Sequence, residues 1–151
     1  MRIMKKMLPL LMVMVMLVFR AGPGLAQDYD AALKAAKRAQ KPLLLYFFSK
    51  SCGYCVEMDR TTLVDKEVDT MLKKDFVFLR VDTDKSRELT RLYRISGTPS
   101  SWFLDASGKP LGEMPGYIKA KDYKKILEFV KGKYYARMDL QQFLEKGPAG
   151  K

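Results

Sequence analysis

The chain has 151 residues and a formal net charge of +11, and 48% of its residues are hydrophobic and 30% charged. This balance is that of an ordinary globular protein, and the length favours a single domain. The sequence contains no histidine, which excludes His-based general acid/base catalysis, Cys–His nucleophile pairs and His-ligated metals. Because there are only two cysteines, one chain cannot form a closed four-cysteine zinc site.

Residues 1–26 have the pattern of a secretory signal peptide. Basic residues near the start are followed by an apolar run of 13 residues, 7–19, interrupted only by Pro9, and then by small residues over 21–26. A run of this length is too short to span ~30 Å of hydrocarbon at ~1.5 Å per residue, which argues against a membrane anchor. We therefore expect cleavage after Ala26 and a periplasmic protein, whose cysteines meet an oxidising environment.

Export would also change the charge of the protein. Residues 1–26 carry four basic side chains and no acidic ones, so the formal charge falls from +11 to +7 on cleavage. The remaining lysines are scattered along the chain, with no stripe of interleaved aromatic residues. We therefore read the charge as a solvated basic surface and expect no nucleic-acid partner.

The rest of the chain alternates helical and strand patterns. In chain order we expect a helix over 28–39, a buried strand over 43–48, a helix after the cysteines, a helical segment capped by Asp65, a strand over 76–82, a helix over 86–93, a strand over 100–104, a hairpin loop over 105–109, an edge strand over 111–114, a helix over 121–131 and a short helix over 139–145. Helices alternating with buried strands predict parallel pairing, to which the hairpin adds an antiparallel edge. We therefore place one domain at residues 27–146 and a flexible tail at 147–151.

The segment Cys52-Gly53-Tyr54-Cys55 lies between a buried strand and a helix. The unpaired N–H groups at the start of a helix stabilise a thiolate, so we expect Cys52 to have a lowered pKa and to act as the nucleophile. Cys55 lies one turn inside the helix, where it is less exposed and can resolve a mixed disulfide by attacking Cys52. Gly53 leaves steric access to the sulfur, and Tyr54 is either a partner contact or simply exposed.

With these cysteines, and with Thr98-Pro99 and Gly116 at matching positions, the chain resembles the thioredoxin superfamily over roughly residues 28–131. The resemblance implies an α/β thioredoxin fold, with a central mixed sheet flanked by helices. It also implies a cis peptide bond at Pro99 beside the active-site disulfide, and substrate contacts from Gly53, Tyr54 and Thr98. The sequence around the cysteines is most similar to periplasmic thioredoxin-like proteins, including the C-terminal domain of transmembrane thiol–disulfide interchange reductases.

The chain departs from thioredoxin at three positions near the cysteines. Tyr46 stands where the family has a buried acid, Ser51 replaces a tryptophan, and the dipeptide between the cysteines is Gly-Tyr. Tyrosine is a poor base at neutral pH, since its reference pKa is about 10. These changes leave open the redox potential and the group that accepts the proton of Cys55, for which Glu57 is a nearby carboxylate.

The resemblance implies an exported thiol–disulfide oxidoreductase that reduces disulfides of exported proteins through Cys52 and Cys55. We expect the redox-active disulfide to serve without a metal or a separate cofactor, a membrane electron donor to recycle it, and the protein to be a monomer. The alternatives are the oxidase or isomerase direction, a Cu(I)-binding or delivery module, and a purely structural disulfide. Soft thiolate and thioether ligands suit Cu(I), but the copper-delivery proteins of this fold add a histidine, which this chain lacks.

Overall fold

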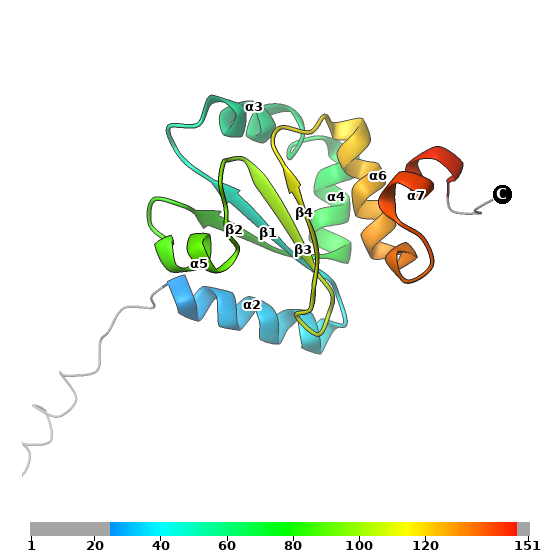
Figure 1. Cartoon of the computed structure of the whole chain (residues 1–151), viewed down its shortest axis with the longest axis horizontal. Coiled ribbons are helices and arrows are strands. Elements are labelled where there is room, and N and C mark those ends of the chain that lie inside the picture. The colour runs from blue at the N-terminus through cyan, green and yellow to red at the C-terminus, as the bar shows by residue number, and fades with distance from the viewer. Residues whose placement is uncertain (1–24, 148–151) are drawn as a thin grey trace, which may run out of the picture.

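A four-stranded mixed sheet lies at the centre of residues 25–147, which are the part of the chain that the computed structural model describes (Figure 1). The strands are β1 (Leu43–Phe48), β2 (Val77–Asp82), β3 (Ser100–Leu104) and β4 (Pro110–Pro115), in the order β2-β1-β3-β4. The helices are α2 (Leu25–Ala39), α3 (Gly53–Thr61), α4 (Lys66–Asp75), α5 (Arg87–Leu92), α6 (Ala120–Lys131), the 3-10 turn η1 (Tyr134–Ala136) and α7 (Leu140–Lys146). The expected α/β fold with a mixed sheet between helices is confirmed.

Strand β1 is the central element because its side chains are apolar on both faces. Residues 43–47 are fully buried. Leu44 and Tyr46 pack in one core cluster with residues of α3, α4 and α6, whereas Leu43, Leu45 and Phe47 pack in a second cluster with α2 and α5. A continuous apolar run is what a strand covered on both sides requires.

The pairing of the strands corrects one expectation. β1 and β2 are parallel, as predicted, but β1 and β3 are antiparallel, with Phe47 beside Ser100. A parallel β3 would need the chain to return to the other end of the sheet after β2, whereas Asp82 pairs with Phe48 and Ser100 with Phe47, so residues 83–99 begin and end at the same end of the sheet. This brings Pro99 to the end of the sheet at which Cys52 follows β1.

Helix α2 begins earlier than the sequence predicts. Its first residue is Leu25, so Asp28 lies in the first turn instead of preceding the helix. The helix runs through the expected cleavage position after Ala26, and residues 1–24 of the expected signal peptide lie outside the described part of the chain, as do 148–151 of the expected tail. The signal peptide and the tail stay predictions.

The expected cap of α4 is present. The Asp65 carboxylate accepts hydrogen bonds from the backbone N–H groups of Glu67 at 3.0 Å and Val68 at 3.2 Å. Asp139 caps α7 in the same way by accepting from the N–H of Gln142 at 2.8 Å. Both carboxylates satisfy donors that a helix start leaves without intrahelical partners.

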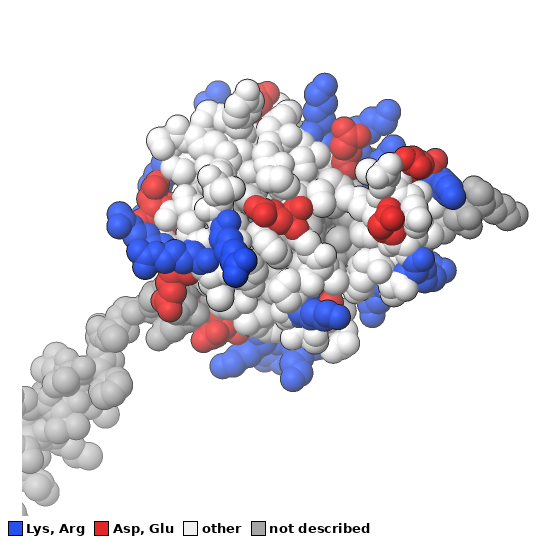
Figure 2. Space-filling model, in the orientation of Figure 1, with Lys and Arg blue, Asp and Glu red and all other residues white. Residues whose placement is uncertain are grey.

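The surface mixes both charges. Figure 2 shows lysines and arginines interspersed with aspartates and glutamates over the face in view, with uncharged surface between them. Within residues 25–147, no helix is both long and apolar enough to cross a membrane.

Candidate active site

Cys52 is the N-cap residue of helix α3. Its backbone is extended (φ −87°, ψ 110°), and its sulfur accepts a hydrogen bond from the backbone N–H of Cys55 at 3.1 Å. Both cysteines are free thiols in this structure. Cys52 is partly exposed and Cys55 is 1% exposed, so an approaching disulfide meets Cys52 first.

The surroundings move the pKa values of the two thiols in opposite directions. Partial burial works to raise the pKa of Cys52, but the interactions of its sulfur with the Cys55 and Thr98 side chains and with the backbone N–H groups of Cys55 and Tyr54 outweigh burial, and the pKa is lowered. Burial raises the pKa of Cys55, and its interaction with the Cys52 sulfur raises it further. The arrangement therefore favours the thiolate on Cys52, the accessible sulfur. The thiolate, and not the thiol, is the form that carries out exchange.

The Thr98-Pro99 loop lies against this sulfur. The peptide bond between the two residues is cis, Pro99 is buried, and the Thr98 carbonyl accepts a hydrogen bond from the Cys52 thiol at 3.2 Å. The backbone N–H of Gly116 donates to the Pro99 carbonyl at 2.7 Å. The Thr98-Pro99 loop therefore contacts Cys52 at one end of the sheet, and the Gly116 loop packs against Pro99 behind it.

Gly53 and Tyr54 are the exposed residues of the cysteine loop. A Cβ placed on Gly53 would meet no atom beyond its neighbours in the chain within 4 Å, so the space beside residue 53 is open. The Tyr54 side chain is 70% exposed. The site residues that the sequence predicts, Cys52, Cys55, Pro99, Gly53, Tyr54 and Thr98, thus lie at the cysteines or in the loop against them. Glu57, the carboxylate considered as proton acceptor, is exposed on α3.

Tyr46, which stands where thioredoxin has a buried acid, packs beside an ion pair between Arg80 and Asp59 that was not predicted from the sequence. Tyr46 is fully buried, and its hydroxyl has no hydrogen-bond partner within the described residues. The Arg80 guanidinium lies 5.1 Å from the centroid of the Tyr46 ring and makes two hydrogen bonds of 2.8 Å to the carboxylate of Asp59. Burial raises the pKa of Tyr46 far above its ordinary value, so this hydroxyl is not a base. The sequence does contain a signal for this arrangement, because Asp59 follows Cys55 by one helical turn and Arg80 is the one charged residue in the apolar run of residues 76–81.

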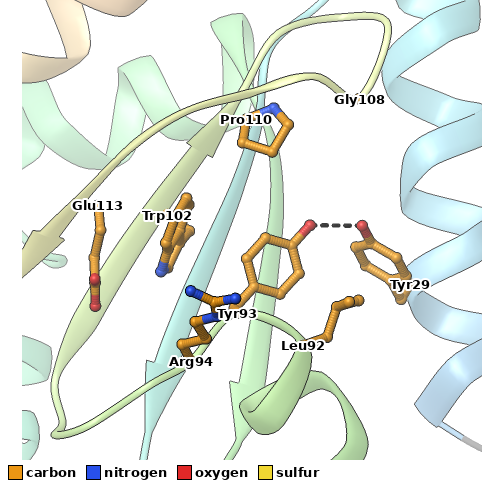
Figure 3. Close-up of a pocket in the computed structure, with 8 residues that line it drawn as sticks. All are labelled: Tyr29, Leu92, Tyr93, Arg94, Trp102, Gly108, Pro110 and Glu113. Atoms are coloured by element: carbon orange, nitrogen blue, oxygen red, sulfur yellow. Dashed lines mark hydrogen bonds between the residues drawn. The ribbon is translucent and has the colours of Figure 1, made fainter.

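A hollow of about 650 Å³ shares no lining residue with the cysteine site (Figure 3). Its walls come from α2, from the end of α5 and from β3 and β4, and include Trp102, whose ring packs edge-on against Tyr93 at 5.3 Å. The hydroxyls of Tyr29 and Tyr93 are hydrogen-bonded at 2.6 Å across one side of the hollow (Figure 3). Trp102 thus contributes packing on this face of the sheet and is not part of the cysteine site.

Residues 29–131 match the family model of a thioredoxin-like domain. The chain belongs to the thioredoxin-like family. It is 30% identical over 103 residues to the thiol:disulfide interchange protein DsbD of Vibrio vulnificus, which covers 64% of this chain and 17% of DsbD. It is 28% identical over 100 residues to the disulfide bond reductase DsbH of Chlamydia pneumoniae, over 58% of this chain and 60% of DsbH.

Among solved structures, the oxidised C-terminal domain of DsbD from Neisseria meningitidis matches with a TM-score of 0.62 at 24% identity, over 70% of this chain and 95% of that domain. This likeness shows a shared fold. The chain therefore corresponds to one domain of DsbD and spans a small part of the full-length DsbD that it matches.

Proposed function

We propose that the protein is an exported thiol–disulfide oxidoreductase that reduces disulfides of other exported proteins. The observation that carries the proposal is the pair of cysteines at the start of α3, where Cys52 is accessible with a lowered pKa and Cys55 is buried with a raised pKa. Its membership of the thioredoxin-like family supports the same reaction class.

The chemistry follows from these two positions. The Cys52 thiolate attacks one sulfur of a substrate disulfide, so that a Cys52–substrate disulfide forms and the other substrate sulfur leaves as a thiolate, which takes up a proton. Cys55 then loses its proton and attacks the Cys52 sulfur, which forms the Cys52–Cys55 disulfide and releases the second substrate thiolate. The substrate gains two electrons, which the protein loses. Of the two protons that the substrate thiols take up, one replaces that given up by Cys55 and the other comes from solvent, because Cys52 reacts as the thiolate.

The reducing direction is supported by the similarity to the disulfide bond reductase DsbH. A reductase that leaves this reaction oxidised needs a donor of two electrons before it can act again. We propose a membrane protein with a dithiol as that donor. Export itself rests on the signal-peptide pattern of residues 1–26.

The experiment that tests the direction is the equilibrium redox potential of the Cys52–Cys55 couple, measured in glutathione or dithiothreitol buffers. Thioredoxin-fold proteins range from about −270 mV for thioredoxin to about −120 mV for a strong oxidant. We expect a value toward the thioredoxin end. A value near the oxidant end would overturn the reducing direction, and a Cys52→Ser protein gives the baseline because it cannot form the disulfide.

A further inference from the structure

Two tyrosines lie together beside the cysteine loop. Tyr54 is the residue between Gly53 and Cys55, and Tyr117 follows Gly116, whose N–H donates to the Pro99 carbonyl. The ring centroids of Tyr54 and Tyr117 are 6.5 Å apart, and the rings are inclined by 32°. Because 70% of the Tyr54 side chain is exposed, much of this aromatic pair faces solvent next to the reactive sulfur.

The Tyr117 segment is held in place by hydrogen bonds at three successive residues. Gly116 donates to the Pro99 carbonyl at 2.7 Å, and the Ile118 carbonyl accepts from the buried Thr62 hydroxyl at 2.6 Å. Between them, the Tyr117 hydroxyl is 3.1 Å from the hydroxyl of Thr61.

The direction of that hydroxyl contact can be assigned. Thr61 donates its hydroxyl hydrogen to the Glu57 carbonyl at 2.8 Å, so the Tyr117 hydroxyl is the donor to Thr61. Tyr117 is therefore fixed against α3 before any partner arrives. A side chain that is already ordered loses little conformational entropy on binding.

The residues that precede Cys52 have a different character. The Ser49 hydroxyl is 3.0 Å from the hydroxyl of Ser51 and donates to the carboxylate of Asp84 at 2.9 Å. This side of the cysteine loop is polar and charged, with Asp84 and the exposed Lys50, whereas Tyr54 and Tyr117 offer ring surface. The surface around Cys52 is thus polar on one side and aromatic on the other, so different side chains of a bound polypeptide are favoured on the two sides.

We propose that Tyr54 and Tyr117 bind a bulky apolar side chain, aromatic by preference, that lies next to the substrate's cysteine. The inference rests on the proposed function, because a polypeptide whose sulfur reaches Cys52 must cover the neighbouring Tyr54. An aromatic side chain buries a large area there and adds ring–ring contacts with favourable geometry. A small or acidic side chain at the same place gains neither contribution.

The test uses peptides that carry one cysteine as a mixed disulfide with glutathione. The peptides are identical except for phenylalanine or alanine at a position next to the cysteine, placed in separate pairs on its N-terminal and its C-terminal side. We expect the reduced protein to release the phenylalanine peptide about threefold to tenfold faster, in second-order rate constant, than its alanine counterpart in at least one pair. Equal rates in both pairs would overturn the proposal.

Variants locate the preference on the two rings. Tyr54→Ala and Tyr117→Ala should each bring the phenylalanine-to-alanine rate ratio toward one. Tyr117→Phe keeps the ring and loses only the bond to Thr61, so its ratio should exceed that of Tyr117→Ala; equal ratios would contradict a role of the ring. Leu144→Ala is the matched control, because Leu144 is an exposed apolar residue on α7, and its ratio should equal that of the unchanged protein.

Reaction of the unchanged protein with glutathione disulfide separates this inference from the proposed function. If a Cys52–Cys55 disulfide forms while both peptide pairs react at equal rates, the exchange function stands and the aromatic preference is wrong. If no such disulfide forms, the proposed function fails, and the inference fails with it.

Discussion

Arg80 links strand β2 to the cysteine-bearing helix through Asp59. Its guanidinium makes two parallel hydrogen bonds of 2.8 Å with the Asp59 carboxylate and lies 4.6 Å from the centroid of the Phe48 ring as well as 5.1 Å from that of Tyr46. Planar guanidinium groups suit both contacts at once, since they pair with carboxylates in two places and stack on rings. The pair thus holds α3 against the sheet one helical turn beyond Cys55.

We predict that this pair is coupled more strongly than an ordinary surface pair. In a double-mutant cycle with Arg80→Ala and Asp59→Asn, the coupling in the free energy of unfolding should be about 1 kcal/mol, the upper end for half-exposed pairs, because the geometry is bidentate. The measurement is urea unfolding of the four proteins. The matched control is Lys73 and Asp69, an exposed pair at helical spacing, for which about 0.3–0.5 kcal/mol is expected. Equal coupling in the two cycles would contradict the prediction.

Arg80→Lys is a stricter form of the same test. Lysine keeps the positive charge but can neither form the two parallel hydrogen bonds nor stack in the same way. We expect its stability to lie close to that of Arg80→Ala in urea unfolding. Recovery of the full stability by lysine would show that charge alone accounts for the contact.

The two buried tyrosines of one core cluster should respond in opposite ways to loss of the hydroxyl. Tyr46 has no hydrogen-bond partner for its hydroxyl within the described residues, whereas the Tyr123 hydroxyl is 2.9 Å from that of Ser101. Leaving a buried polar group unpaired costs about 1–3 kcal/mol, and a typical hydrogen bond contributes about 1 kcal/mol. Tyr46→Phe should therefore maintain or raise the free energy of unfolding, and Tyr123→Phe should lower it by about 1 kcal/mol.

Urea unfolding of both variants checks this contrast. A loss of stability in Tyr46→Phe as large as that in Tyr123→Phe would mean that the Tyr46 hydroxyl is hydrogen-bonded in solution. As a control, the rate of Cys55 alkylation is compared in folded and unfolded protein. Both variants should protect Cys55 when folded, because the cysteine is buried.

The sequence predicts most of the fold because its strands are marked by hydrophobicity. The apolar run at residues 43–48 needs cover on both faces, which predicts a central strand with helices on either side of the sheet. The sequence does not predict the direction of β3, because periodicity identifies an element but not the end of the sheet to which the chain brings it. Residues 83–99 begin and end at the same end of the sheet, and β3 is therefore antiparallel to β1.

The residues of the site likewise fall into those that the sequence predicts and those that it does not. Cys52, Cys55 and Pro99 belong to short motifs whose residue types and spacing can be read directly from the sequence. Asp59, Arg80 and Tyr117 carry no such motif, because each acquires its partner from a different element when the chain folds. Pair contacts across elements depend on register and side-chain direction, which a single sequence does not specify.

The pH dependence of thiol modification follows from the lowered pKa of Cys52. A lowered pKa means that the thiolate persists to lower pH than in an ordinary thiol, whose reference value is about 8.5. The rate of iodoacetamide modification of the reduced protein should therefore rise with pH through a midpoint below 8.5. Cys52→Ser should remove this phase, because Cys55 is buried with a raised pKa. A midpoint at or above the ordinary value would contradict the role of Cys52 as the favoured thiolate.

Loss of the resolving thiol should trap the substrate. In Cys55→Ser the Cys52 thiolate can still attack, since its N-cap position and the backbone N–H of residue 55 are kept. Without the second sulfur the Cys52–substrate disulfide has no internal nucleophile to break it, so it should persist at least about a hundredfold longer than with the unchanged protein, in keeping with loss of an intramolecular reaction partner. Non-reducing electrophoresis with a peptide disulfide measures this lifetime, and Cys52→Ser, which should form no adduct, is the control. Rapid turnover by Cys55→Ser would show that Cys55 is not the resolving residue, because release would then depend on an external thiol.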